Sequence, residues 1–333
     1  MEQVNGATYP KIELHVHLEG TVRPATLLKI ARRNGLSLPF DNEEDLAELY
    51  RFRDFEHFID VWVMTTNVLL AVDDYREITV DYAREAKRHG AVYIEAIFSP
   101  AGRVRRGAHW EEMFEGVCDG ADQARESLGI EVRFTPDIAR DDEPALAEET
   151  ARWAVRYRDR GVVGIGLGGL EDGFPPEPFA RAFEIAREGG LGSVPHAGEA
   201  SGLSSIRGAI DVLHADRIRH GIRAADHPEL TAELAEREIV LDICPTSNVR
   251  TRSVPSMDAH PLPELLAAGV LCSISTDDPA MFGTDLATEH NEARGLGADP
   301  RGMWDAGLTG ALCDETTRAD LTSIGEASDW SAA

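Results

Sequence analysis

Ile12-Glu-Leu-His-Val-His17 is the stretch of sequence from which the fold can be worked out. It is a short run rich in Ile, Leu and Val that closes on two histidines, and a glycine follows at position 20. Such a run predicts a β-strand. Runs of the same kind recur along the chain: two of them also end in a histidine, at positions 196 and 220, and Asp277 and Asp278 follow shortly after another.

Amphipathic helical patterns separate these runs from one another. The eight predicted strands are Ile12–His17, Val92–Phe98, Ile130–Thr135, Val162–Leu167, Gly192–His196, Arg217–His220, Ile239–Ile243 and Val270–Ser275. The helical patterns include Pro144–Arg158, Pro178–Glu188, Leu230–Arg237 and Pro263–Ala268. Eight strands with helical crossovers predict an α/β protein, a (β/α)₈ TIM-type barrel over residues 10–320 within a single catalytic domain, 1–333. A doubly wound sheet is the alternative, but it would usually have a glycine-rich phosphate loop after its first strand, and none follows here.

The longest interval between predicted strands follows the first one. Residues 40–70 contain more apolar side chains than one crossover helix can bury: Phe40, Leu49, Phe52, Phe55, Phe58, Trp62 and Met64. They indicate two or three extra helices at about residues 38–70. Because insertions after barrel strands surround the mouth of the barrel, these helices are predicted to form a lid.

Composition narrows the class of partner. The chain of 333 residues carries 33 Lys and Arg against 59 Asp and Glu, a formal net charge of −26. Nucleic acids and anionic membranes are bound by basic surfaces, so neither is an expected partner. No stretch is apolar over the ~18 residues of a membrane span, and no secretory signal is recognised at residues 1–9. Four scattered cysteines without a CxxC pair favour a reducing cytoplasm, and the oligomeric state is left open.

Histidines and an aspartate at the ends of predicted strands indicate a metal site. His15 and His17 are two residues apart on a strand, so both imidazoles leave the same face. His196 suits a third ligand, and one carboxylate of the pair Asp277 and Asp278 suits a fourth. Three histidine nitrogens, one carboxylate oxygen and an open position describe a catalytic zinc better than a structural one. Such a metal would supply hydroxide near neutral pH, which predicts metal-assisted hydrolysis.

Three further residues at these strand ends could move protons or hold an electrophile. Glu199 follows His196 after two small residues and suits a general acid, although alone it could equally be an exposed loop carboxylate. His220 ends the sixth predicted strand, where a structural role is the alternative. Asp278 could face the substrate or cap the helix that follows it.

Taken in order along the chain, these motifs resemble those of the adenosine deaminase family of the amidohydrolase superfamily. The resemblance covers about residues 10–320 and rests on Lys11-Ile-Glu-Leu-His-Val-His-Leu-Glu-Gly20, Tyr93-Ile-Glu-Ala-Ile-Phe-Ser-Pro100, Val163-Gly-Ile-Gly-Leu-Gly-Gly169, His196-Ala-Gly-Glu199, Arg219-His-Gly221, Cys244-Pro-Thr-Ser-Asn248 and Ser275-Thr-Asp-Asp-Pro279. It implies a (β/α)₈ barrel with one zinc that replaces the 6-amino group of a purine nucleoside, such as adenosine or 2′-deoxyadenosine, by oxygen and releases ammonia.

The resemblance also implies a role for each site residue. The zinc ligands would be His15, His17, His196 and Asp277. Glu199 would protonate N1 of the purine, and His220 would orient the attacking water and accept or stabilise its proton. The substrate would be contacted by His17, Glu19, Gly169 and Asp278, with Asp278 at N7 and the backbone of Gly169 at N3. The predicted fourth strand has no lysine of the kind that bridges two metals in other amidohydrolases, which favours a single metal.

Departures from the family pattern fall on the sugar side of the site. Glu19 stands where the best-known adenosine deaminases have an aspartate that touches the ribose 5′-hydroxyl, and Ile97 replaces a familiar arginine. A longer acid, with the glycines of 166–169, leaves room for a bulkier 5′ substituent, as in the bacterial branch that includes aminodeoxyfutalosine deaminases of menaquinone synthesis. Adenine is the third candidate, because the Ser-Ser-Glu element typical of adenine deaminases is missing at 168–171.

Two hypotheses from other classes remain. A non-catalytic, zinc-stabilised scaffold or nucleoside-binding protein would bind metal without turnover, but the full set of acid, base and ligand residues gives it no support. A different amidohydrolase that acts on a cyclic amide would hydrolyse its substrate without a purine.

Overall fold

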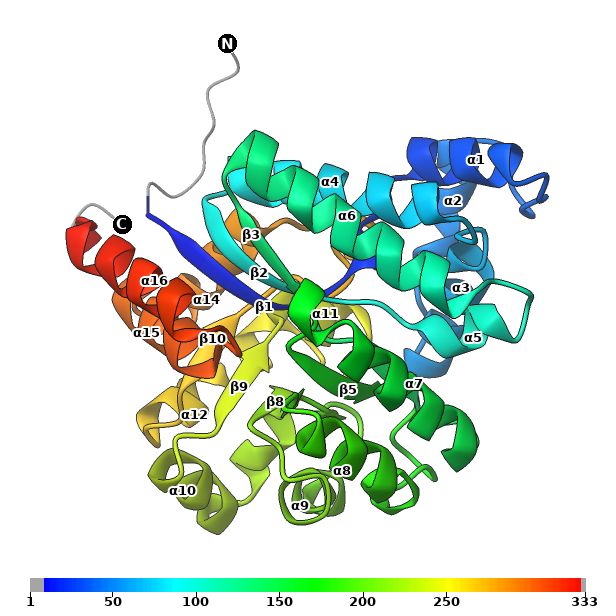
Figure 1. Ribbon diagram of the computed structural model, residues 1–333. Coiled ribbons are helices and arrows are strands. Elements are labelled where there is room, and N and C mark those ends of the chain that lie inside the picture. The colour runs from blue at the N-terminus through cyan, green and yellow to red at the C-terminus, as the bar shows by residue number, and fades with distance from the viewer. Residues whose placement is uncertain (1–8, 331–333) are drawn as a thin grey trace.

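A ring of parallel strands surrounded by helices is seen in the computed structural model, which describes residues 9–330 (Figure 1). The strands are β1 (Lys11–His17), β2 (Ala91–Ile97), β3 (Glu131–Phe134), β4 (Asp137–Ala139), β5 (Gly164–Gly168), β6 (Gly192–Ser193), β7 (His196–Ala197), β8 (Arg217–His220), β9 (Val240–Ile243) and β10 (Cys272–Ile274). The helices are α1 (Pro24–Arg33), α2 (Glu43–Leu49), α3 (Phe55–Thr66), α4 (Val72–Arg88), α5 (Pro100–Val104), α6 (Trp110–Leu128), α7 (Pro144–Arg156), α8 (Ala180–Glu188), α9 (Leu203–Asp211), α10 (Pro228–Glu236), α11 (Pro245–Arg250), α12 (Leu262–Ala267), α13 (Pro279–Phe282), α14 (Leu286–Gly295), α15 (Pro300–Gly310) and α16 (Glu315–Ala327).

The ring closes between its first and last strands. Neighbouring strands pair in parallel in the groups β1-β2-β3, β4-β5-β6 and β7-β8-β9-β10, and a bridge between Phe134 and Val162 joins the first two groups. At the closing point His17 N donates to Asp277 O at 2.8 Å, and Asp277 N donates to His15 O at 3.1 Å. The (β/α)₈ barrel predicted from the sequence is therefore confirmed.

Two barrel strands are interrupted by prolines, which was not predicted from the sequence. In place of the predicted strand Ile130–Thr135, β3 ends at Phe134, and the chain rejoins the ladder as β4 after Pro136. In the same way, Pro195 separates β6 from β7. Proline has no N–H to donate to a ladder. Each proline still accepts a ladder bond, because Gly166 N donates to Pro136 O and Arg219 N donates to Pro195 O, both at 3.0 Å. The barrel is therefore continuous across both breaks.

The other predicted elements agree closely with the structure. The remaining six predicted strands match β1, β2, β5, β8, β9 and β10 to within two residues at each end. The four predicted helices match α7, α8, α10 and α12 with the same tolerance. The spacing of apolar residues and the local composition are thus sufficient to locate these elements, because each element buries one apolar stripe or run against the barrel.

Helices α1, α2, α3 and α4 fill the long interval between β1 and β2, and Figure 1 shows the first three of them grouped with α5 on one side of the barrel. Helix α3 begins where the Asp54 side chain accepts a hydrogen bond from His57 N, a typical N-cap. The ring of Phe58 packs against those of Phe52 and Phe282, with centroids 5.2 and 5.1 Å apart. Since Phe282 lies in α13, just after the last barrel strand, this packing holds α3 over the carboxyl ends of the strands.

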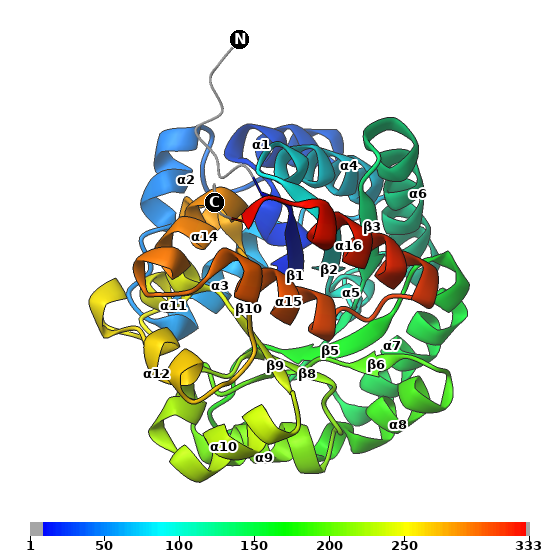
Figure 2. The same ribbon diagram turned by 90° about the vertical axis from the view of Figure 1, so that its left-hand side faces the viewer.

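The amino ends of the strands are closed by α15 and a buried ion-pair cluster. Arg217 donates through Nε to Asp242 Oδ2 at 2.6 Å and through Nη2 to Glu95 Oε2 at 2.8 Å. Its Nη1 also donates to Gly310 O at 2.6 Å, at the end of α15. Figure 2 looks onto α15 and α16, and α15 contacts β1 and β10. A buried charge is retained only when it is paired, so this cluster fixes β2, β8 and β9 to one another beneath the site.

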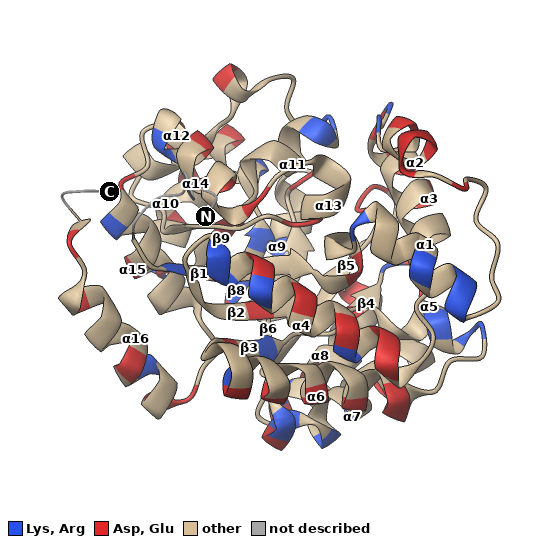
Figure 3. Cartoon of the chain, turned by 90° about the horizontal axis from the view of Figure 1, so that it is seen from above, with Lys and Arg blue, Asp and Glu red and all other residues tan. Residues whose placement is uncertain are grey.

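Acidic and basic residues are interspersed on the outer helices, as Figure 3 shows along α4 and α6. On α4 Arg84 pairs with Asp81, and on α6 Arg125 pairs with Asp122, each at 2.7 Å. Exposed pairs of this kind contribute little to stability. Part of the acidic charge is therefore neutralised locally, and the excess of acidic over basic residues is unchanged. Within residues 9–330, no helix has both the length and the apolar character to cross a membrane.

Candidate active site

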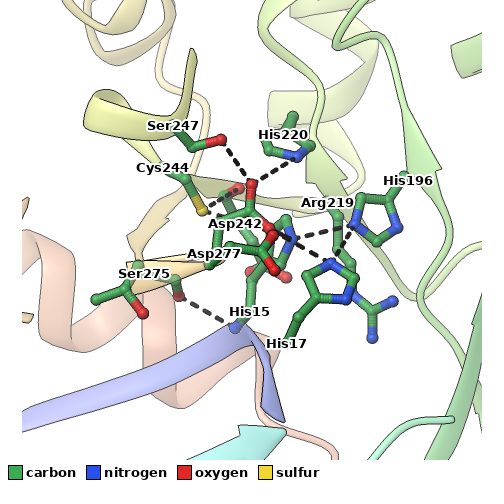
Figure 4. A network of polar contacts seen from close by, with 12 residues as sticks. His15, His17, His196, Arg219, His220, Asp242, Cys244, Ser247, Ser275 and Asp277 are labelled. Atoms are coloured by element: carbon green, nitrogen blue, oxygen red, sulfur yellow. Dashed lines mark hydrogen bonds and ion pairs between the residues drawn. The ribbon is translucent and has the colours of Figure 1, made fainter. Parts of the chain in front are cut away.

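The predicted site residues come together at the carboxyl ends of the barrel strands. His15 and His17 belong to β1, His196 to β7 and His220 to β8, and Asp277 follows β10. Figure 4 shows their side chains converging from these separate strands. This end of a parallel barrel is where sites of this fold are built, because the loops after the strands surround it.

Three imidazoles and one carboxylate direct their free atoms at one point. His196 Nε2 lies 3.1 Å from His15 Nε2 and 3.2 Å from His17 Nε2. Asp277 Oδ1 lies 3.2 Å from His15 Nε2 and 3.4 Å from His17 Nε2. Zinc with bonds of about 2.0–2.1 Å and ligand angles of about 90–120° would separate neighbouring ligand atoms by roughly 2.9–3.5 Å, in an arrangement that keeps a further position for water. The four donor atoms therefore have the spacing of a ligand set for one metal ion.

The protonation states of these residues also suit a metal. Burial lowers the pKa values of His15 and His196 well below the ordinary value for histidine. It also lowers the pKa of His17 to about 4, so all three imidazoles are neutral near pH 7. Neutral imidazole offers the lone pair that binds metals. Burial alone would raise the pKa of Asp277, but its interactions with His15, followed by those with His220 and His17, outweigh burial and hold that pKa well below the usual range. The set therefore presents three neutral nitrogens and one carboxylate anion.

Neighbouring groups orient the ligands. His196 Nδ1 donates to Leu167 O at 2.9 Å, which leaves the lone pair on Nε2. Ser247 Oγ donates to Asp277 Oδ2 at 2.6 Å, so that Oδ1 faces the imidazoles. His17 Nδ1 is buried and has no hydrogen-bond partner among residues 9–330. The contacts of His196 and Asp277 therefore fix the tautomer or the direction of these ligands before a metal binds.

Cys244 belongs to a second possible ligand group. Its Sγ and one nitrogen each of His15 and His220 lie within 4.8 Å of one another. Burial raises the pKa of the Cys244 thiol well above its ordinary value, whereas metals bind the thiolate. The histidine and aspartate set is the better site, since its members are already in the form that binds.

Two residues of the site have a left-handed backbone, which is uncommon outside glycine. The angle φ is +64° at Asp277 and +60° at His220. Residues held in this region cost of order 1–3 kcal/mol and persist only where the surroundings fix them. At Asp277 the two backbone bonds to β1 supply that constraint. The turn lets Asp277 face the imidazoles, while the next residue, Asp278, contacts Trp62.

Glu199 lies beside the ligands in a form that suits an acid. Burial, followed by the charges of Asp277 and Glu171, raises the pKa of Glu199 well above its ordinary value. Thr251 Oγ1 donates to Glu199 Oε1 at 3.2 Å, and His220 Nε2 lies 3.4 Å from Oε2. A carboxyl that keeps its proton can donate it to a substrate. The alternative of an exposed loop carboxylate is wrong, because only 4% of the residue is exposed.

Glu171 holds the loop that carries Glu199. Its carboxylate accepts hydrogen bonds from the backbone N–H groups of Gly198 and Glu199, both at 2.8 Å, and of Ala200 at 2.9 Å. Ser205 Oγ adds a fourth bond at 2.5 Å. This role was not predicted from the sequence, because no spacing links Glu171 to a turn 27 residues later.

A cavity of about 500 Å³ opens over these residues. Its inner wall includes His17, Gly169, Glu199, His220 and Asp278. Its outer wall comes from α3 and from the segment at and after α5, with Phe55, Phe58, Ile59, Trp62, Val63, Arg103, Arg105 and Arg106. The site is therefore polar at the bottom and bounded further out by apolar rings and guanidinium groups.

Asp278 faces this cavity. It occupies the N-cap position of α13, but its side chain makes no capping hydrogen bond, so a capping role is wrong. Instead, Asp278 Oδ1 accepts a hydrogen bond from Trp62 Nε1 at 2.7 Å. Burial and the charge of Asp277 raise the pKa of Asp278 well above its ordinary value. Gly20 provides the space, because a Cβ atom there would lie 1.8 Å from Asp278 Oδ1.

Glu19 is buried behind the wall of the cavity. Its Oε1 accepts a hydrogen bond from Ser99 N at 2.8 Å and lies 3.5 Å from Arg103 Nη2. Ser99 and Arg103 line the cavity, and Glu19 does not. Direct contact between Glu19 and a sugar stays a prediction, and in the structure its effect on the cavity passes through these two neighbours.

The family model described as adenosine deaminase matches residues 10–324. The chain belongs to the adenosine deaminase family. Like the family, this deaminase is a hydrolase that acts on a cyclic amidine, and the resemblance seen in its motifs is confirmed. Its buried histidine and aspartate group is a metal-binding group of the amidohydrolase type.

Known relatives of this deaminase differ in the substrate that their names state. An aminodeoxyfutalosine deaminase of Acidothermus cellulolyticus is 52% identical over 99% of this chain and 94% of the relative. A solved adenine deaminase from Arthrobacter aurescens superposes with a TM-score of 0.90, is 31% identical and covers 95% of this chain and 98% of its own. A solved amidohydrolase from Burkholderia ambifaria with bound zinc superposes with a TM-score of 0.87, at 30% identity over 96% of this chain and 90% of its own.

Proposed function

We propose that this deaminase acts on aminodeoxyfutalosine, a 6-aminopurine nucleoside with a bulky 5′ substituent. The observation that carries the proposal is the 52% identity to the relative of that name, sustained over 99% of the chain. The order of candidates thus differs from the one based on motifs, in which adenosine and 2′-deoxyadenosine came first. Adenine is the second candidate, favoured by the structural neighbour at 31% identity.

The cavity supports a substrate larger than a free base. Its volume of about 500 Å³ lies within the range of pockets that hold drug-sized ligands. A purine would occupy the inner end, beside Glu199 and Asp278. The apolar rings of Phe55 and Phe58 and the guanidinium of Arg106 line the outer end, where a substituent on the sugar would lie.

One zinc ion is proposed as the cofactor, held by His15, His17, His196 and Asp277. Its support is the spacing of the four donor atoms, the mixed nitrogen and oxygen donor set, and the zinc bound in the Burkholderia ambifaria neighbour. When bound, zinc would lower the pKa of a water and supply a nucleophile near neutral pH. The four protein ligands position it at the bottom of the cavity.

The remaining site residues are proposed to bind the purine and to move protons. Glu199 would donate its proton to purine N1, which makes C6 electrophilic. Asp278, whose pKa burial also raises, would donate to N7, and the backbone of Gly169 would meet N3. His220 would orient the oxygen that attacks C6. Addition of water at C6 and loss of the amino group as ammonia then give the 6-oxo product.

The helical insertion is proposed to act as a lid within a single catalytic domain, residues 1–333. Its support is that α3 contributes five apolar side chains to the cavity wall: Phe55, Phe58, Ile59, Trp62 and Val63. A cytoplasmic location is proposed as well, because the four cysteines are all free thiols.

Substrate choice is tested by kcat/KM for aminodeoxyfutalosine, adenosine, 2′-deoxyadenosine and adenine, measured side by side on the zinc-loaded enzyme from the change in purine absorbance. Aminodeoxyfutalosine should exceed the other three by about 10-fold or more, the discrimination that one filled subsite provides. A higher value for adenine would replace the proposal by the second candidate. Failure to turn over any of the four would contradict deamination of 6-aminopurines.

A further inference from the structure

A chain of hydrogen bonds reaches His220 from behind, and one backbone amide sets its direction. Leu262 N donates to His260 Nδ1 at 3.1 Å. A backbone N–H is always a donor, so His260 Nδ1 is the acceptor and the proton of the neutral ring is on Nε2. Burial lowers the pKa of His260 to about 4, so the ring is neutral near pH 7.

Asn248 transmits this direction to His220. His260 Nε2 lies 3.1 Å from Asn248 Oδ1, which accepts its proton. The other amide atom, Asn248 Nδ2, lies 3.1 Å from His220 Nδ1. An amide nitrogen only donates, so His220 Nδ1 is the acceptor in this contact. Turning the amide over would place its NH₂ group against the N–H of His260, so the chain of bonds has one consistent direction.

Burial keeps water from competing with these bonds. Asn248, His220 and His260 are each at most 2% exposed. Leaving a buried donor or acceptor without its partner is destabilising, so a reversed arrangement with two donors facing each other is strongly disfavoured.

We propose that Asn248 and His260 are positioning residues that fix His220 in the tautomer with its proton on Nε2. That nitrogen faces the site, 3.4 Å from Glu199 Oε2 and 3.7 Å from Asp277 Oδ2. With the proton there, neutral His220 offers a donor to the reacting groups and no lone pair. It therefore orients an oxygen by donating to it and does not remove a proton from it. This is narrower than the role implied by the family resemblance, and it rests on the proposed function.

The substitution Asn248→Asp tests the direction of these hydrogen bonds, because the aspartate side chain has nearly the same shape as that of asparagine. A carboxylate cannot donate to His220 Nδ1 and favours a proton there, which leaves a lone pair on Nε2. The value of kcat should fall about 10²-fold, the scale for loss of one preorganised donor, with a smaller change in KM and unchanged zinc content. Asn291→Asp, the same substitution at an exposed position of α14, is the control and should keep the activity of the parent.

The tautomer is measured without turnover from the ¹⁵N resonances of labelled histidines, with His220 assigned by its loss in His220→Gln. The parent should show a protonated Nε2 and an unprotonated Nδ1, and Asn248→Asp should move the proton to Nδ1. His260→Ala removes the donor to Asn248 Oδ1 and should lower kcat in the same direction by less.

Two results would overturn the inference. One is a proton on Nδ1 of His220 in the parent, a measurement that needs no variant to fold. The other is an Asn248→Asp enzyme that folds, holds zinc and turns over like the parent. If the parent deaminates no 6-aminopurine, the proposed function fails, while the measured tautomer still decides the inference.

Discussion

Trp62 Nε1 donates a hydrogen bond to Asp278 Oδ1 at 2.7 Å, joining helix α3 to a residue 216 positions later in the chain. The bond satisfies a buried carboxyl oxygen at the bottom of the cavity. Arg103 lies over the same indole, with its Cζ 5.0 Å from the ring centroid. The position of α3 is therefore coupled to the group proposed to bind the purine.

Trp62→Phe tests this coupling, because it keeps an aromatic ring and removes the N–H donor. We expect the free energy of unfolding to fall by about 1–3 kcal/mol, since Asp278 Oδ1 loses its partner in a buried place. We also expect KM to rise more than kcat falls. Denaturant unfolding and steady-state kinetics measure the two effects. Trp110→Phe, at a ring stacked on Trp153, is the control and should leave KM unchanged.

Gly20→Ala should disable the site with little effect on the rest of the fold. A Cβ atom at residue 20 would lie 1.8 Å from Asp278 Oδ1, so the carboxyl must move. Misplacing a positioned group by about 1 Å can lower the rate about 10²-fold. The comparison is kcat/KM against Gly295→Ala, where a Cβ atom meets nothing within 4 Å. Equal activity in the two variants would show that Asp278 is not needed where it lies.

Glu199→Gln should lower kcat by about 10²–10⁴-fold, the usual contribution of a general acid, because glutamine has no acidic proton. Zinc content and thermal stability should stay near those of the parent. Loss of purine absorbance gives the rate, and metal analysis gives the zinc content. Glu112→Gln, an exposed position on α6, controls for the substitution itself. Normal turnover in Glu199→Gln would exclude the proposed acid.

Glu289 should make stability depend on pH. Burial raises the pKa of this carboxyl from 4.5 to about 7 in the folded protein, where it accepts a hydrogen bond from Thr246 N. The folded state therefore holds the proton more tightly than the unfolded state. Its contribution to stability is full below pH 4.5 and is lost as the pH rises to about 7. Across that window the unfolding free energy of Glu289→Gln should decline less than that of the parent, and parallel curves would contradict the assignment.

Metal removal should abolish turnover and lower the unfolding temperature. The proposed ligands come from β1, β7 and the segment after β10, so an ion bound only by the folded chain stabilises it by mass action. Chelation followed by zinc addition, monitored by activity and thermal unfolding, should reverse both losses. Asp277→Asn should bind zinc more weakly, whereas Asp258→Asn, at an exposed position, should not. Full activity in a metal-free preparation would contradict the proposed cofactor.

The strands, and the side-chain directions that follow from them, could be predicted because they depend on local patterns. Two residues of spacing on a strand are enough to place His15 and His17 on one face. Prolines at 136 and 195 were not predicted to interrupt strands, because the bonds that carry the ladder across them come from neighbouring strands. The ends of the strands next to these prolines could therefore be located only in the assembled barrel.

The partners of the site residues could not be predicted, because they are set by tertiary packing. Trp62 was noted as part of an aromatic insertion, but its bond to Asp278 depends on how α3 lies over the barrel. Asn248 belongs to the motif Cys244-Pro-Thr-Ser-Asn248, whereas no sequence pattern connects His260 to His220. The left-handed turn at Asp277 likewise follows from backbone bonds to a strand more than 250 residues earlier.

The closure of the barrel lies at the proposed zinc site. Asp277 N donates to His15 O there, and the side chains of these two residues belong to the same ligand group. During synthesis the histidines of β1 emerge first, and the carboxylate that completes the set emerges only near the end. The ion would therefore link β1, the first strand to be synthesised, to the segment after β10, the last. Metal retention should report on ring closure, and a fragment that stops before residue 277 should bind the ion weakly even where its other strands have formed.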